Sequence, residues 1–174
     1  YNIFGEEFVE NNKNSIDLII NEDKKGLVKE YKLNKGENKI EIIIKNNIIN
    51  LQNMFYCCSK LTNIEELKYL DTKEVKNFSG MFSNCSSLSD IKSLENWNVS
   101  NGNNFSGMFS NCLSLSDIKS LEKWNVSNGI NFCEMFSNCS SLCDIKSLEN
   151  WNVSNGNNFN GMFSNCSSLS DKNH

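Results

Sequence analysis

The sequence predicts an α/β solenoid built from 27-residue repeats, with a β-rich cap at its N-terminal end. Two series of residues predict this fold class, because each recurs once every 27 residues. The first is a set of Met-Phe pairs that begin at Met54, Met81, Met108, Met135 and Met162. The second is a set of cysteines, Cys58, Cys85, Cys112, Cys139 and Cys166. A period of this length is typical of a solenoid, in which each repeat forms one coil stacked on its neighbours.

The pattern divides the chain near residue 50. We expect an N-terminal cap at residues 1–50, a solenoid of four full repeats and a partial one at residues 51–170, and a polar tail at residues 171–174. The first coil of a solenoid has no neighbour on one side, so its apolar end must be covered. A separate ligand-binding domain at residues 1–50 is the alternative.

Three apolar segments of the cap have the composition of strands. Residues 16–20 and 27–31 flank a polar stretch at residues 21–26, which predicts a hairpin. Residues 39–44 are rich in isoleucine and predict a third strand. Residues 6–12 predict a short helix that precedes the hairpin.

Each repeat begins with a stripe of apolar residues. Phe105, Met108, Phe109 and Cys112 follow the spacing i, i+3, i+4, i+7, which predicts a short amphipathic helix.

The second half of each repeat has a different spacing. Apolar residues of the third repeat recur at steps of three from Leu115 to Trp124, which predicts a 3₁₀-like turn that Ser116 and Asp117 can cap. Apolar and polar residues then alternate over residues 124–127, which predicts a short strand. Stacking of the coils would place these strands in a parallel sheet.

Residues 71–82, Asp-Thr-Lys-Glu-Val-Lys-Asn-Phe-Ser-Gly-Met-Phe, resemble the bacterial surface protein repeat, the BspA-like branch of the leucine-rich repeats. The resemblance extends over about residues 46–170. It implies a right-handed, leucine-rich-repeat-like coil that is displayed at a cell surface or secreted and serves adhesion or protein recognition. A cytoplasmic location is the alternative.

One position departs from the pattern of that family. Val75 matches the family valine, but glycine replaces it at Gly102, Gly129 and Gly156. A β-branched residue resists positive φ, so Val75 argues that these glycines do not serve a left-handed turn. We interpret them as structural.

The eight cysteines do not predict a metal site or a cofactor site. The five that repeat lie on the apolar stripe, where a free cysteine behaves as a small buried hydrophobe. The single histidine, His174, provides no partner for a Cys/His zinc site. We therefore expect reduced, unreactive thiols, with a disulfide between Cys133 and Cys143 as the alternative.

Composition argues against several classes of function. The net charge is −4 and the 17 basic residues are scattered lysines, which excludes a basic surface for nucleic acid. No apolar run reaches the roughly 18 residues that a membrane-spanning helix needs. The chain has no arginine and no internal histidine, and no repeat carries a separate reactive cluster, so we do not expect an enzyme.

Two functions remain. The first is a recognition or adhesion module that binds a protein or a glycan through the solenoid surface. Its candidate binding face consists of outward-pointing polar residues, Asn98, Ser100, Asn125, Ser127, Asn152 and Ser154. The same residues could instead form a solvated face whose asparagines satisfy one another. The second function is an intracellular structural scaffold that assembles through the ends and edges of the solenoid, with self-association through those ends.

Overall fold

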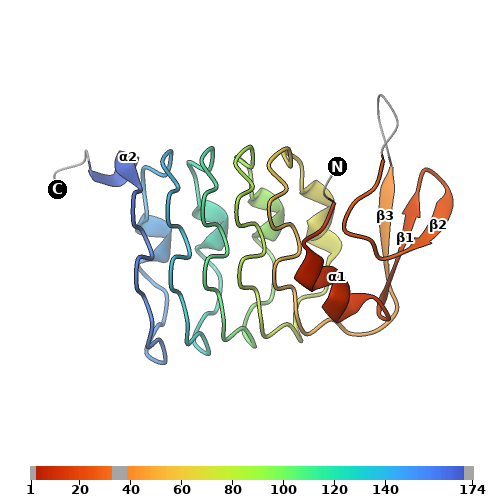
Figure 1. Cartoon of the computed structure of the whole chain (residues 1–174). Helices are drawn as coiled ribbons and strands as arrows, with labels where there is room; N and C mark the ends of the chain where they lie inside the picture. Colours follow the sequence, from red (N-terminus) through yellow and green to blue (C-terminus); the bar gives the residue numbers. More distant parts are fainter. Residues whose placement is uncertain (1–2, 33–38, 171–174) are drawn as a thin grey trace.

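The computed structural model describes residues 3–32 and 39–170, so the predicted polar tail at residues 171–174 lies outside the described part. The chain forms a rod in which successive coils lie side by side (Figure 1). A three-stranded antiparallel sheet lies at the N-terminal end of the rod, and the short helix α2 (Ser167–Ser170) lies at the other end.

Two predicted elements of the cap are confirmed residue by residue, namely α1 (Glu6–Asn12) and β1 (Ile16–Ile20). The third strand, β3 (Ile40–Ile44), is also confirmed. It pairs with β1 in a sheet with the order β2-β1-β3.

The second strand of the hairpin was predicted in the wrong place. The structure places β2 at Asp23–Gly26, inside the stretch that we expected to be the turn, and residues 27–31 form no strand. The actual turn is the two-residue pair Asn21 and Glu22, which have positive φ angles of 49° and 74°. This is the geometry of a type I′ turn, but the pair lacks the glycine that normally announces one.

Residues between Phe4 and Asn12 cover the outer face of the first coil. The Phe4 ring lies 5.7 Å from the Phe55 ring, measured between centroids. The N–H of Gly5 donates to the carbonyl of Met54 at 2.9 Å, and the side chain of Asn12 donates to the carbonyl of Asn50 at 3.4 Å. The apolar surface and the carbonyl groups of this coil therefore have partners in the cap.

The predicted amphipathic helix at residues 105–112 is wrong, because this segment consists of consecutive tight turns. The N–H groups of Met108 and Cys112 donate to carbonyls three residues earlier, at 3.2 and 3.1 Å. Gly107 and Asn111 have positive φ angles of 58° and 59°, which an α-helix does not accommodate. A type II turn requires positive φ at its third position, which glycine or asparagine occupies in these turns except at Cys57 and Glu134.

The helix-like spacing has a simple cause. A turn of four residues runs from Phe105 to Met108, and a second runs from Phe109 to Cys112. The first and last residues of each turn point into the core, so two turns in succession produce apolar positions at i, i+3, i+4 and i+7. Sequence spacing alone does not separate this arrangement from one face of a helix.

The remaining backbone groups of these turns join one coil to the next. The N–H groups of Phe105, Gly107 and Phe109 each donate to a carbonyl 26 residues later, at 2.8 Å. Parallel bridges accordingly connect an equivalent asparagine in each coil, at Asn50, Asn77, Asn104, Asn131 and Asn158. The strand predicted at residues 124–127 is absent, and the parallel pairing lies on the turn segment instead.

Four 3₁₀-helices occupy the second half of the coils: η1 (Glu65–Tyr69), η2 (Lys92–Leu94), η3 (Lys119–Leu121) and η4 (Lys146–Leu148). The helix η3 lies within the segment where steps of three predicted it. The carboxylate of Asp117 accepts the N–H of Lys119 at 2.7 Å, so the predicted cap at this residue is confirmed.

The core consists of columns of identical side chains that run along the rod. In one column the rings of Phe105 and Phe132 stack with centroids 5.4 Å apart, and in another those of Trp97 and Trp124 stack at 6.4 Å. The indole N–H of Trp124 donates to the carbonyl of Leu94 in the preceding coil at 2.9 Å, which fixes the ring in its column.

Gly102 shows why glycine replaces valine in the later coils. A Cβ atom at this position would lie 2.5 Å from the ring of Phe105, which packs directly against the backbone. Gly102 does not have a positive φ. Among the described glycines, only Gly80, Gly107 and Gly161 do. The structural interpretation of Gly102 is therefore confirmed.

Candidate binding site

The candidate binding face lies on the corner that follows the 3₁₀-helix of each coil. Trp124 and Val126 point into the core, and Asn125 between them is exposed. The same alternation occurs one coil before, at Trp97, Asn98 and Val99, whereas one coil after, Val153 is exposed like Asn152. The candidate residues form a strip along the rod. Its three asparagines, Asn98, Asn125 and Asn152, are exposed. Of its serines, Ser100 and Ser127 are half-buried and Ser154 is exposed.

The side-chain oxygens of these asparagines are already used within their own coil. The Oδ1 atom of Asn98 accepts the N–H of Ser100 at 3.1 Å and its hydroxyl at 2.7 Å. The Oδ1 atom of Asn125 accepts the N–H of Ser127 at 3.1 Å in the same way. Such a bond satisfies a turn amide, as asparagine commonly does two residues ahead of a backbone N–H.

A second row of asparagines holds the corners together, and sequence analysis did not identify it. The side-chain amide of Asn128 donates to the carbonyl of Ser100 in the preceding coil at 2.8 Å. Asn101 and Asn155 make the equivalent bonds at 2.7 Å. The asparagine that follows each Asn-Val-Ser segment was the available signal, because it recurs with the repeat.

These bonds decide what the strip offers to a ligand. The oxygens of Asn98, Asn125 and Asn152 are occupied, whereas their –NH2 groups donate to no other described residue. The strip therefore presents an uncharged row of amide donors, one per coil, at the spacing of stacked strands, about 4.8 Å. Such a row suits a ligand that carries hydrogen-bond acceptors at regular intervals.

A second polar surface runs along the 3₁₀-helices, where neighbouring coils enclose shallow charged grooves. One of them has a volume of about 580 Å³, and both carboxylates and ammonium groups line it. The Nζ atom of Lys123 lies 2.9 Å from the carboxylate of Glu95, and this hydrogen bond lowers the pKa of the Glu95 carboxyl group. Because both charges are present in similar number, the groove has no strong preference for ligands of one sign.

The repeating cysteines lie in the core rather than at a reactive site. The thiol of Cys112 donates to the carbonyl of Phe82 at 3.2 Å, and burial raises its pKa well above the ordinary range. Burial also raises the pKa of Cys58 to about 11 and that of Cys139 to about 12. All eight cysteines are free, so the alternative disulfide between Cys133 and Cys143 is absent.

Within residues 3–32 and 39–170, no three His, Cys, Asp or Glu side chains gather as they would around a metal ion. In the same part of the chain, no helix has the length and apolar composition needed to cross a bilayer.

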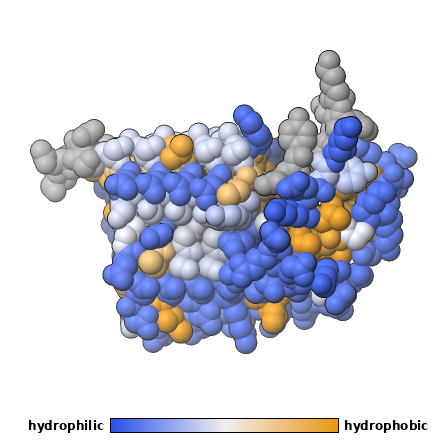
Figure 2. All heavy atoms as spheres, in the orientation of Figure 1, coloured by the Kyte–Doolittle hydropathy of each residue, from blue (hydrophilic) through white to orange (hydrophobic). Residues whose placement is uncertain are grey.

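Figure 2 shows that hydrophilic side chains predominate on the face of the rod in this view, with a larger hydrophobic area near the end that carries the sheet. That area lies beside the sheet of the cap.

Comparison with known proteins gives a family match. No curated protein and no solved structure shows significant similarity to the chain. A family model, in contrast, matches twice, over residues 26–141 and again over residues 118–174. The two matches overlap and together span well over half of the chain, including the repeats and part of the cap. A recurring match of this kind is typical of a repeat protein. The chain therefore belongs to the family described as "Mycoplasma protein of unknown function, DUF285".

Proposed function

We propose that the chain is a solenoid recognition module that binds a protein or a glycan without catalysing a reaction. We also propose that the repeats are similar to the BspA-like leucine-rich repeats and that the chain serves adhesion at a cell surface. The segment at residues 71–82 supports that likeness, because it resembles the repeat of that family.

One observation carries the proposal, namely the row of amide donors at Asn98, Asn125 and Asn152. These three side chains are exposed, occupy equivalent positions and keep their –NH2 groups for an external acceptor. A rigid array of this kind needs little ordering when a ligand binds, because each side-chain oxygen is already fixed by its own coil. Glycan hydroxyls and peptide carbonyls both supply acceptors at intervals of a few ångströms.

The test exchanges each of the three asparagines for aspartate, which is nearly isosteric. The aspartate oxygen can still accept the N–H two residues ahead, but the donor is lost and an acceptor replaces it. Binding would be measured on a glycan array and a peptide array. Loss of three neutral hydrogen bonds of about 1 kcal/mol each corresponds to roughly a 100-fold weaker affinity.

A matched control changes three carboxylates outside the strip, at the C-terminal ends of the 3₁₀-helices, with Glu95→Gln, Glu122→Gln and Glu149→Gln. This variant replaces three carboxylates by amides, whereas the test variant replaces three amides by carboxylates. It leaves the strip intact. We expect it to bind like the unmodified chain. If both triple variants bind the same ligands equally well, the strip is only a solvated face and the proposal is wrong.

The second candidate function is a structural scaffold, and the last coil supplies the observation that favours it. Val153 and Phe159 are 37% and 40% exposed, although their equivalents in earlier coils are buried. Apolar surface of this kind can pair with another coil. Sedimentation velocity over a wide range of concentration tests this candidate, and a monomer throughout would contradict it.

A further inference from the structure

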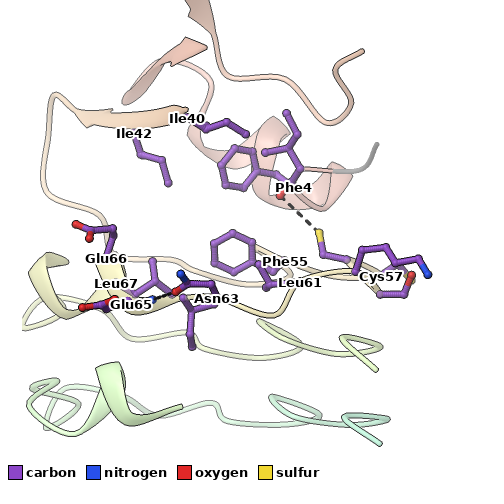
Figure 3. Close-up of a pocket in the computed structure, with 15 residues that line it drawn as sticks. Phe4, Ile40, Ile42, Phe55, Cys57, Leu61, Asn63, Glu65, Glu66 and Leu67 are labelled. Carbon is purple, nitrogen blue, oxygen red and sulfur yellow. Dashed lines mark hydrogen bonds between the residues drawn. The ribbon is translucent and has the colours of Figure 1, made fainter. Parts of the chain in front are cut away.

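An apolar hollow lies between the sheet of the cap and the first coil (Figure 3). Its volume is about 610 Å³, which falls within the range of ligand-binding pockets. Isoleucines of β3 form one wall, and aromatic and aliphatic residues of the N-terminal segment and the first coil form the others. The apolar residues of these walls include Phe4, Ile40, Ile42, Phe55, Leu61 and Leu67.

The hollow lies on the side of the sheet where burial is incomplete. Leu18 of β1 is buried, whereas Ile42, its direct partner on β3, is only half-buried. Ile16 is likewise buried, while its partner Ile44 is 41% exposed. Side chains of directly paired residues lie on the same face of a sheet, so the inner face is covered at β1 and open at β3.

The edge of β3 that faces away from β1 pairs with no other strand in the described part of the chain. The N–H of Lys45 donates to the carbonyl of Ser15 at 2.8 Å, and the N–H of Asn21 donates to the carbonyl of Lys39 at 3.0 Å. Hydrogen-bonded and non-hydrogen-bonded pairs alternate along antiparallel strands. The N–H and carbonyl groups of Ile40, Ile42 and Ile44 therefore point away from β1. Because β3 is an edge strand of the sheet, these groups face outward.

The two edges of the sheet differ in their protection. β2 is only four residues long and carries Lys24 and Lys25, which are features that prevent further strand pairing. β3 has the sequence Ile-Glu-Ile-Ile-Ile, an apolar edge that favours it. An added strand would therefore pair with β3.

Acidic side chains set the charge of the hollow. Glu65, Glu66 and Lys60 all line it, so carboxylates outnumber ammonium groups. Glu65 is paired with Lys68, at 3.0 Å between carboxylate oxygen and Nζ. Glu66 is exposed and forms no ion pair with any residue of the described part of the chain. A cationic group on a ligand would complement it.

We propose that this hollow binds an extended peptide segment of a partner protein, which pairs with the free edge of β3. Alternate apolar side chains of the peptide occupy the hollow, and a lysine or arginine lies beside Glu66. A peptide satisfies all three features at once, because it supplies apolar side chains, backbone N–H and carbonyl groups, and a cation. An acyl chain or another hydrocarbon supplies only the first. Strand addition of this kind is a common mode of peptide recognition.

The experiment uses the full chain and a library of synthetic peptides that alternate threonine with a varied apolar residue and end in lysine. Binding would be measured by fluorescence anisotropy. The best binder would then be compared with a copy N-methylated at all of its threonine and apolar residues, a copy with glutamate in place of lysine, and decanoic acid as an acyl competitor. N-methylation removes backbone donors without removing apolar side chains.

We expect the N-methylated peptide to lose binding and the glutamate peptide to bind more weakly. Glu66→Gln should weaken the lysine peptide about two- to fivefold, as for a solvent-exposed ion pair. The matched control Glu122→Gln, an exposed carboxylate far from the hollow, should leave affinity unchanged. Ile42→Ser should weaken every peptide, with unchanged circular dichroism showing that the fold is kept.

Several outcomes would overturn the proposal. They are failure of the whole library to bind, equal binding of the N-methylated copy, and displacement of the peptide by decanoic acid. Dimerisation that Ile42→Ser abolishes would assign the β3 edge to a second copy instead of a partner protein. The triple aspartate variant of the polar strip should bind these peptides normally, so this test and that of the proposed function can fail independently.

Discussion

The inner coils and the last coil have nearly the same residues but differ in burial. Phe105 is fully buried in an inner coil, whereas Phe159 at the same position of the last coil is 40% exposed. Val126 and Val153 differ in the same way. The ring of Phe105 stacks on Phe78 at 5.3 Å and on Phe132 at 5.4 Å, whereas Phe159 stacks only on Phe132, at 5.2 Å.

This difference shows that burial belongs to the contacts between coils and not to the sequence of any one coil. A repeat supplies half of each contact, and the next repeat supplies the other half. The N-terminal end resolves the same problem differently, because Phe4 and α1 cover the first coil there. Substitutions at equivalent positions should therefore have different effects in different coils.

The largest expected effect is on the aromatic columns. Phe109→Ala should lower the free energy of unfolding by about 3–5 kcal/mol, because it opens a cavity among fully buried neighbours. Phe159→Ala should lower it by only about 1 kcal/mol, because that ring is already partly exposed. Urea titration of both variants measures the two losses. Equal losses would mean that stacking between coils does not determine stability.

The next effect is on stability at alkaline pH. A thiol whose pKa is raised in the folded state stabilises the fold at low pH, and this contribution is lost as pH rises from the unfolded pKa, about 8.5, through the folded value. Burial raises the pKa of Cys139 to about 12, so the loss for this residue should extend over the interval from about 8.5 to about 12.

The measurement is urea unfolding at a series of pH values from neutral to alkaline. Cys139→Ala should reduce the alkaline slope of the unfolding free energy. Cys166→Ala, in the last coil, provides the comparison. Burial also raises the pKa of Cys166, but it lies at the end of the array and should contribute a smaller slope. A slope that neither substitution changes would show that the buried thiols do not control alkaline stability.

The smallest effect concerns a single turn. Glu134 has a positive φ of 54° at the position where other coils have Gly80, Gly107 and Gly161. A residue with a Cβ atom is strained there, so Glu134→Gly should raise the free energy of unfolding by about 1 kcal/mol.

The reciprocal variant, Gly107→Glu, should destabilise the chain by a similar amount. Both changes are measured as shifts of the thermal midpoint. A loss of stability in Glu134→Gly would indicate that the glutamate makes a compensating contact and that the turns of different coils are not equivalent.

Several elements followed from the sequence alone. The helix α1 and the strand β1 have the predicted bounds, and η3 lies where apolar residues recur at steps of three. These elements depend on local spacing and composition, which the sequence shows directly. The hairpin was misplaced because Asn21 and Glu22 form a tight turn without a glycine.

The candidate strip was predicted in part. Exposure of Asn98, Asn125 and Asn152 followed from alternation with buried residues. Sequence spacing did not show that their oxygens are used by the following serines, or that Asn128 bonds to the preceding coil. The apolar hollow was not predicted at all. Ile42 and Leu67 meet there although they are distant in the chain.

The sequence by itself determined which residues share a column, because a constant period of 27 residues places equivalent side chains one coil apart. The tertiary structure decided what conformation the apolar stripe adopts. In an isolated segment, the N–H groups of Phe105 and Phe109 could bond within a helix. In the stacked array, those groups donate to the carbonyls of Asn131 and Met135 in the next coil. A backbone N–H makes one strong hydrogen bond, so pairing between coils excludes the helix that the spacing suggests.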